Sequence, residues 1–111
     1  MAPNIDEETG RKIQELQILE QNYQALLMQK QAFQLESNEL KNALEEVEKS
    51  KGDAFKVIGQ VMVKTDKKVL KKDISEKQEL LTLRLKSINK QETSLREDIE
   101  RIRSDVVSRI Q

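Results

Sequence analysis

One short apolar segment, residues 54–65 (AFKVIGQVMVKT), constrains the fold of this chain more than any other feature. Its β-branched and aromatic residues favour strands, and Gly59-Gln60 suits a two-residue turn with glycine first. The segment is therefore predicted to form a β-hairpin in which Ile58 pairs with Val61. A lone hairpin is only marginally stable in water, and both of its edges lack partners. We expect the chain to be one part of a larger assembly.

Both faces of this predicted hairpin carry apolar side chains. Pairing outward from the turn places Phe55 opposite Lys64 and Lys56 opposite Val63, so each face holds three apolar residues and one lysine. Such a hairpin must pair with hairpins of other chains. Subunit assembly is therefore assigned to its six large apolar residues: Phe55, Val57, Ile58, Val61, Met62 and Val63.

Apolar residues recur in heptads on both sides of the hairpin. The first segment has the series Ile5, Lys12, Leu19, Leu26, Phe33, Leu40, Val47 and the series Thr9, Leu16, Tyr23, Lys30, Ser37, Leu44. The second segment has the series Ile74, Leu81, Ile88, Leu95, Ile102, Arg109 and the series Lys71, Gln78, Leu85, Glu92, Ile99, Val106. Heptads sustained over this length predict a coiled coil. The composition agrees, because the chain has only three aromatic residues and one proline.

The predicted fold is mainly α: a long antiparallel coiled-coil hairpin with a central β-hairpin. We expect one domain over residues 1–111, with a first helix at 5–50, the β-hairpin at 54–65 and a second helix at 66–110. Antiparallel pairing would place Ile5 near Gln111. The first helix should end near residues 50–53, where Gly52 suits the C′ position. The start of the second helix stays open between Asp66 and a later position such as Asp73.

The two halves of the chain carry opposite charge. Residues 1–50 hold five Lys/Arg and ten Asp/Glu, while residues 51–111 hold fifteen and ten, which gives net charges of −5 and +5. This difference favours an intramolecular helical hairpin, although each screened surface pair contributes little. Five of the lysines cluster after the hairpin: Lys64, Lys67, Lys68, Lys71 and Lys72. They form either a solvated surface or a contact for a phosphate or an acidic partner.

The composition argues against several classes of function. The chain has no cysteine and no histidine, so we expect no metal site, no cofactor and no catalytic residue. No P-loop or catalytic triad is present, and carboxylate pairs such as Glu45 and Glu46 read as solvated helix faces. No apolar run is long enough to span a membrane, and the N-terminal residues do not resemble a signal peptide. We expect a cytoplasmic protein that is not an enzyme.

Apolar residues outside the heptads offer a second candidate surface. They are Ile13, Ile18, Leu27, Met28 and Leu35 in the first segment, and Leu80, Leu83, Val107 and Ile110 in the second. A two-helix arm is too thin to hide all of them, and several would gather where the chain ends meet. Such a flexible apolar tip suits the capture of exposed hydrophobic segments. Client binding is assigned to Ile5, Ile13, Leu16, Val106, Val107 and Ile110.

The hairpin residues carry a family resemblance. The run from Phe55 to Gly59, followed by Val61 to Lys64, resembles the aromatic-Lys-x-(Val/Ile)-Gly-x-Val-x-Val-Lys hairpin of prefoldin beta subunits. The segments EKQELLTLR at 76–84 and NKQE at 89–92 are similar to the second arm of archaeal members. Phe55 departs from the tyrosine that is common in the family, and the lysine-rich segment at 67–72 departs as well.

The resemblance implies a fold, an assembly and a function. Prefoldin is a hetero-hexamer of two alpha and four beta subunits, whose hairpins join into intersubunit β-barrels and whose coiled coils surround an open cavity. It holds non-native client proteins without ATP and passes them to a group II chaperonin. The single hairpin matches the beta type. The expected partners are therefore an alpha subunit, further copies of this chain, unfolded clients and the chaperonin, with no nucleic acid and no membrane.

Our leading hypothesis is an ATP-independent holdase subunit. The alternative is a coiled-coil scaffold or tether that binds one specific partner. A third hypothesis is a helical hairpin that binds RNA through the lysines of residues 64–72.

Overall fold

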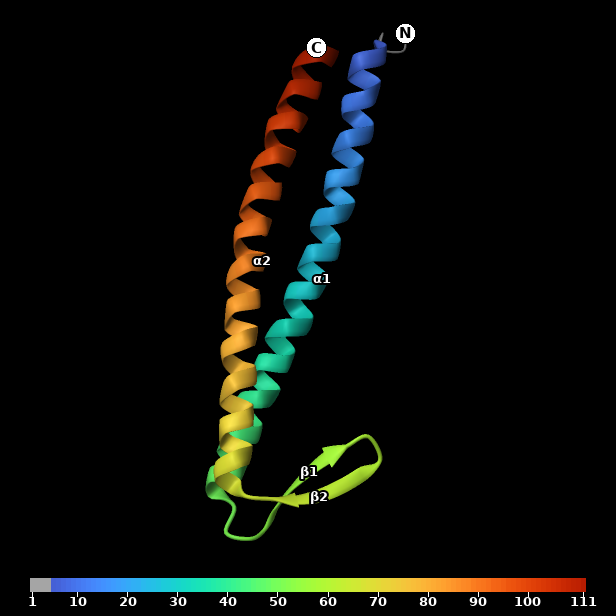
Figure 1. Ribbon diagram of the computed structural model, residues 1–111. Coiled ribbons are helices and arrows are strands. Elements are labelled where there is room, and N and C mark those ends of the chain that lie inside the picture. Colours follow the sequence, from blue (N-terminus) through green and yellow to red (C-terminus); the bar gives the residue numbers. More distant parts are fainter. Residues whose placement is uncertain (1–4) are drawn as a thin grey trace. The chain divides into compact units, whose positions relative to one another are not determined.

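A computed structural model describes residues 5–111 and shows two long helices with a β-hairpin between them (Figure 1). The elements are α1 (Glu7–Lys49), β1 (Ala54–Ile58), β2 (Val61–Thr65) and α2 (Lys67–Ile110). The chain forms two compact units. The terminal unit contains the described residues up to Lys30 together with Ser87–Gln111, and the hairpin unit contains Gln31–Lys86. The predicted single domain over residues 1–111 stays a prediction.

The predicted heptads form the helix–helix seam within each unit. Nearly every heptad residue is buried or half-buried, and the most buried apolar ones lie mainly on α2: Ile74, Leu81, Ile88, Ile99, Ile102 and Val106. Leu26 is their buried counterpart on α1. Ile5 and Arg109 are the exceptions and are exposed, because the helices end there and offer no further turn to cover them. The seam confirms the coiled-coil prediction.

Contacts across the seam show antiparallel helices in both units. In the terminal unit, Glu8 pairs with Arg109 at 3.1 Å and Lys12 pairs with Asp105 at 3.0 Å. In the hairpin unit, the Arg84 guanidinium lies 5.8 Å from the centre of the Phe33 ring. Each contact joins an early residue of one helix to a late residue of the other, as antiparallel pairing requires.

Both helices begin at an aspartate cap. Asp6 accepts a hydrogen bond from the Thr9 amide at 2.7 Å, and the Thr9 side chain and then this amide hold the pKa of the Asp6 carboxyl below its ordinary value. Asp66 accepts a hydrogen bond from the Lys68 amide at 2.8 Å. A side-chain oxygen at this position satisfies an amide that has no partner inside the helix. The second cap places the start of α2 at Lys67 and not at Asp73.

The end of α1 lies close to the predicted position but lacks the predicted glycine cap. The helix ends at Lys49, and the Ser50 amide still donates a helical hydrogen bond to the Glu46 carbonyl at 3.0 Å. Gly52 does not adopt the positive φ of a glycine C-cap, so the prediction that it occupies the C′ position is wrong. The Ser50 carbonyl is instead bound by the Lys67 ammonium. Contact with the first turn of α2 therefore replaces a local glycine cap.

The hairpin has the predicted register. Ile58 lies opposite Val61, Val57 opposite Met62, and the pairing continues to Ala54 opposite Thr65. Gly59 has a φ of 62°, and no other residue among 5–111 has a positive φ. A turn with positive φ only at its first central residue is of type II′, which matches the twist of paired strands. The glycine is needed here because a Cβ would disfavour this conformation.

Candidate functional site

The hairpin carries six large apolar side chains that the described residues leave uncovered. All six residues assigned to assembly are exposed, from 43% for Val63 to 67% for Met62. Strands β1 and β2 pair only with each other, so each strand of this two-stranded sheet keeps one free edge. Apolar side chains beside free backbone edges are the features of a surface that joins other strands.

Ion pairs tie this hairpin to neighbouring segments of its own chain. Lys56 pairs with Asp73 of α2 at 3.3 Å, and Lys64 pairs with Asp53 before β1 at 3.5 Å. Both pairs involve the one lysine on each hairpin face. The lysines are therefore held by carboxylates of their own chain, and the apolar residues are left as the unpartnered part of each face.

The residues assigned to client binding fall into two groups in the terminal unit. Ile5, Val107 and Ile110 are exposed, at 47%, 46% and 42%. Ile13 and Leu16 are half-buried, and Val106 is buried at 7% exposure. Leu16 and Val106 lie in the seam, where each faces the opposite helix. A client could contact Val106 directly only after the helix ends separate, so the exposed group is the better candidate surface.

Charged pairs fasten the helices where this unit ends. Asp105 accepts a hydrogen bond from Arg109 at 3.3 Å and pairs with Lys12 across the seam. The Lys12 ammonium is the main cause of the lowered pKa of the Asp105 carboxyl. Thr9, which the heptads place in the seam, is only 2% exposed beside these charges. The exposed apolar residues therefore stand on a pair of helices held together at their ends.

Polar contacts also occur deeper in the seam of the terminal unit. Lys30 donates a hydrogen bond to Glu92 at 2.8 Å, and Arg96 binds the other oxygen of the same carboxylate at 3.0 Å. Glu92 is one of two buried polar residues among residues 5–111. The heptads marked Lys30 and Glu92 as polar core residues. Their pairing could not be read from the sequence, because it depends on which turns of the two helices face each other.

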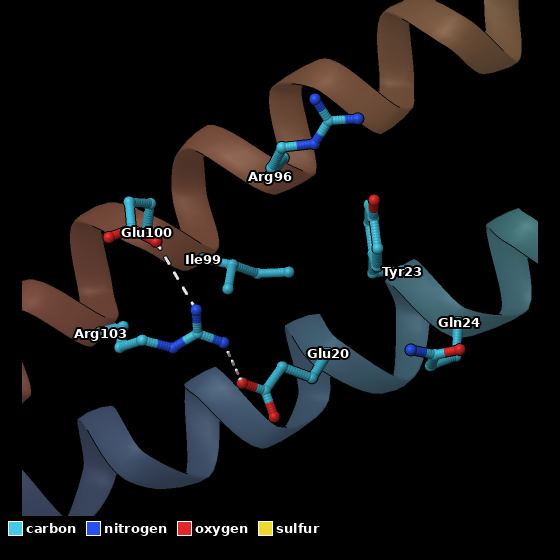
Figure 2. A pocket seen from close by; sticks show the side chains of 7 residues that line it. All are labelled: Glu20, Tyr23, Gln24, Arg96, Ile99, Glu100 and Arg103. Carbon is cyan, nitrogen blue, oxygen red and sulfur yellow. Dashed lines mark hydrogen bonds and ion pairs between the residues drawn. The ribbon is translucent and has the colours of Figure 1, made fainter.

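A groove of about 460 Å³ lies between the helices of the terminal unit. Figure 2 shows the residues that line it, Glu20, Tyr23 and Gln24 from α1 and Arg96, Ile99, Glu100 and Arg103 from α2. Arg103 bridges the groove to Glu20 at 2.9 Å and also contacts Glu100 at 3.6 Å. The lining contains no histidine, serine or cysteine.

Neither a metal-ion cluster nor a membrane-spanning helix is found within residues 5–111. No group of three or more acidic residues is placed to hold a metal ion. No helix in this range is long and apolar enough to cross a bilayer.

Comparison with known proteins decides the family. The protein-family model described as "Prefoldin subunit" matches residues 11–111. The chain belongs to the prefoldin family. Prefoldin beta subunits of Pyrococcus furiosus and Saccharolobus islandicus are 37% and 31% identical to it, over 89% and 96% of this chain and 86% of each relative. A solved structure titled as the prefoldin beta subunit from Thermococcus strain KS-1 superposes with a TM-score of 0.89 at 30% identity, covering 99% of this chain and 98% of that one.

The prefoldin assignment confirms the resemblance to archaeal beta subunits and the predicted fold class of long helices around a β-hairpin. Prefoldin is a family of chaperones rather than of enzymes, and its beta subunits form complexes with alpha subunits. The assignments of individual residues to assembly and to client binding stay predictions.

Proposed function

We propose that this chain is a subunit of an ATP-independent holdase that captures non-native proteins and transfers them to a group II chaperonin in the cytoplasm. The single observation that carries this proposal is the hairpin, whose six large apolar residues are exposed on both faces. A chain of this kind gains burial only by joining strands of other subunits.

The proposed assembly is a hetero-hexamer of two alpha and four beta subunits joined through intersubunit β-barrels. Paired strands in such a barrel would remove the free edges of β1 and β2 and cover both apolar faces at once. The assembly role falls to the hairpin residues named above. Client capture falls to the terminal unit, chiefly to its exposed residues Ile5, Val107 and Ile110.

Client capture is tested by deleting residues 1–8 and 105–111 and measuring how well the hexamer suppresses aggregation of a denatured substrate. The expected result is a loss of protection while the hexamer stays intact, because the apolar ends are gone and the hairpin is untouched. The double variant Val107→Ser/Ile110→Ser should weaken protection without removing the charged pairs at the helix ends. Ile18→Ser/Met28→Ser is the matched control, since both residues are exposed but lie in α1, away from the chain ends. Undiminished protection by the deletion variant and by Val107→Ser/Ile110→Ser would refute the assignment of client binding to these residues.

The same assay separates the holdase from a tether. A holdase should protect several unrelated denatured proteins without added nucleotide, because apolar contact has little sequence preference. A tether should bind one folded partner and protect none of them.

A further inference from the structure

The β-hairpin is joined to the helices by short connections. One residue, Asp66, lies between the end of β2 at Thr65 and the start of α2 at Lys67. On the other side, residues 50–53 form neither helix nor strand between α1 and β1. Such connections fix where the hairpin starts but not its direction, because each residue keeps two soft backbone dihedrals. A contact away from Asp66 is needed to set the direction in which the strands leave α2.

Lys56 makes a contact of this kind. It lies on β1, which is not the strand joined to Asp66, and its ammonium pairs with the Asp73 carboxylate of α2 at 3.3 Å. Among residues 5–111, this is the only ion pair that joins a strand to a helix. Asp73 precedes Ile74, which is buried in the seam. The carboxylate therefore stands on a part of α2 that packing holds in place.

Burial along the strands agrees with this contact. Successive side chains of a strand point to opposite faces, so Ala54, Lys56 and Thr65 share one face of the hairpin. All three are half-buried. The opposite face is exposed along its whole length and consists of Phe55, Val57, Met62 and Lys64. The hairpin thus turns the Lys56 face toward its own chain and leaves the other face open.

We propose that the Lys56–Asp73 pair is a brace that fixes the direction of the hairpin and so positions its free edges for the strands of other subunits. The inference rests on the proposed hairpin assembly. A hairpin whose direction is already fixed loses less conformational freedom when it joins other strands. One exposed ion pair changes an equilibrium by only about threefold. The proposed hexamer repeats this pair in four copies, so the effect on assembly is larger than the effect on one chain.

The second ion pair of the hairpin provides a matched control. Lys64 pairs with Asp53 at 3.5 Å, and both side chains are more exposed than those of Lys56 and Asp73. Asp53 directly precedes the first residue of β1. This pair therefore joins the hairpin to its own connecting segment and not to a helix. Its loss removes the same kind of charges beside the strands without releasing the hairpin from α2.

The brace is tested first in the chain without its alpha subunit. The chain has no cysteine, so Met62→Cys/Leu83→Cys places one spin label on the hairpin and one on α2, both at exposed positions. Pulsed electron paramagnetic resonance gives the distribution of distances between the labels, with labelled chain diluted in unlabelled chain. Adding Asp73→Asn or Lys56→Met should broaden the distribution, whereas Asp53→Asn should leave it unchanged. An unchanged distribution with Asp73→Asn overturns the brace, whether or not the chain assembles.

The positioning role is tested by assembly with the alpha subunit, measured by mass photometry over a dilution series. Lys56→Met and Asp73→Asn should each need about tenfold more protein to assemble, as a small factor repeated in four copies predicts.

The double variant Lys56→Met/Asp73→Asn should be no worse than either single variant, because both changes remove the same contact. Lys64→Met/Asp53→Asn should assemble like the wild type.

The inference is overturned if the effects of Lys56→Met and Asp73→Asn multiply in the double variant, or if Lys64→Met/Asp53→Asn weakens assembly as much. Normal assembly by a variant with a broadened distance distribution also overturns the positioning role. Val57→Asp tests the hairpin assembly separately. If Val57→Asp assembled normally, the hairpin assembly would be wrong, while the distances between the labels would still decide whether the brace exists.

Discussion

Residues of one helix differ sharply in how exposed their side chains are, and this exposure decides how much each residue stabilises the fold. Leu81 is 3% exposed, whereas Leu83, two residues further along α2, is 65% exposed. The same side chain thus has a packing role at one position and very little at the other. Glu92 adds a polar case, because its buried carboxylate is bound by Lys30 and Arg96 at once.

Leu81→Ala should lower the free energy of unfolding by about 2–5 kcal/mol, because it removes buried methyl groups and leaves a cavity. Leu83→Ala is the matched control and should change stability by no more than about 0.5 kcal/mol. Urea denaturation followed by helical circular dichroism measures both. Equal losses in the two variants would contradict the assigned seam.

The stability that Glu92 contributes should depend on pH. The hydrogen bond from Lys30 holds the pKa of the Glu92 carboxyl below its ordinary value of 4.5. A carboxyl with a lowered folded-state pKa stabilises the fold fully above its unfolded pKa, and this stability is lost as the pH falls through the folded pKa. Glu92→Gln should therefore be less stable than the wild type at pH 7, and the two proteins should converge in acid.

Urea midpoints from pH 7 down to pH 3 measure this convergence. Glu97→Gln is the control, since Glu97 is exposed on the same helix and has no ion pair among residues 5–111. It should follow the wild type at every pH. A constant gap between Glu92→Gln and the wild type across this range would show that the carboxylate is not the stabilising group.

The helices and strands can be predicted from the sequence where they depend on contacts between residues close together in the chain. The hairpin register comes from the position of Gly59, because a two-residue turn allows only one pairing of the flanking strands. The ends of the helices were harder to predict. Lys67 binds the Ser50 carbonyl from the next helix, and a contact of this kind has no signature near residue 50.

Val57→Asp or Val61→Asp should abolish the oligomer while most of the helicity remains. A buried carboxylate without a partner is costly in a strand–strand interface, whereas the seam of the helices does not include these residues. Light scattering gives the mass of the assembly, and circular dichroism gives the helicity. Leu83→Asp, another exposed apolar position, is the control and should assemble normally. Complexes of full size from Val57→Asp would rule out the assembly role.

At the scale of the whole molecule, the chain separates its surfaces between units. The hairpin unit carries the strands with their exposed apolar faces, while the terminal unit carries the exposed apolar ends and the ion pairs that cross the seam. The opposite charges of the two halves predicted an intramolecular hairpin. Ion pairs cross the seam in the terminal unit, whereas the ion pairs of the hairpin unit join Lys56 to Asp73 and Lys64 to Asp53.

The mass of the native assembly is the test at this scale. The complex purified from its source should contain four copies of this 12.9 kDa chain together with two alpha subunits. Native mass spectrometry reports the stoichiometry directly. A monomer of 12.9 kDa would contradict the proposed assembly through the exposed apolar hairpin.

The sequence by itself determined the elements that depend on neighbours along the chain: two heptad helices, a hairpin and its register. The helices follow from the heptad periodicity, and the hairpin register follows from Gly59. Both signals depend on residues that are close together in the sequence. Only the tertiary structure decided how far the apolar end residues outside the heptads are covered, since Ile13 is half-buried whereas Val107 is exposed. It also decided which charges pair, because an ion pair across the seam depends on how two helices distant in sequence meet.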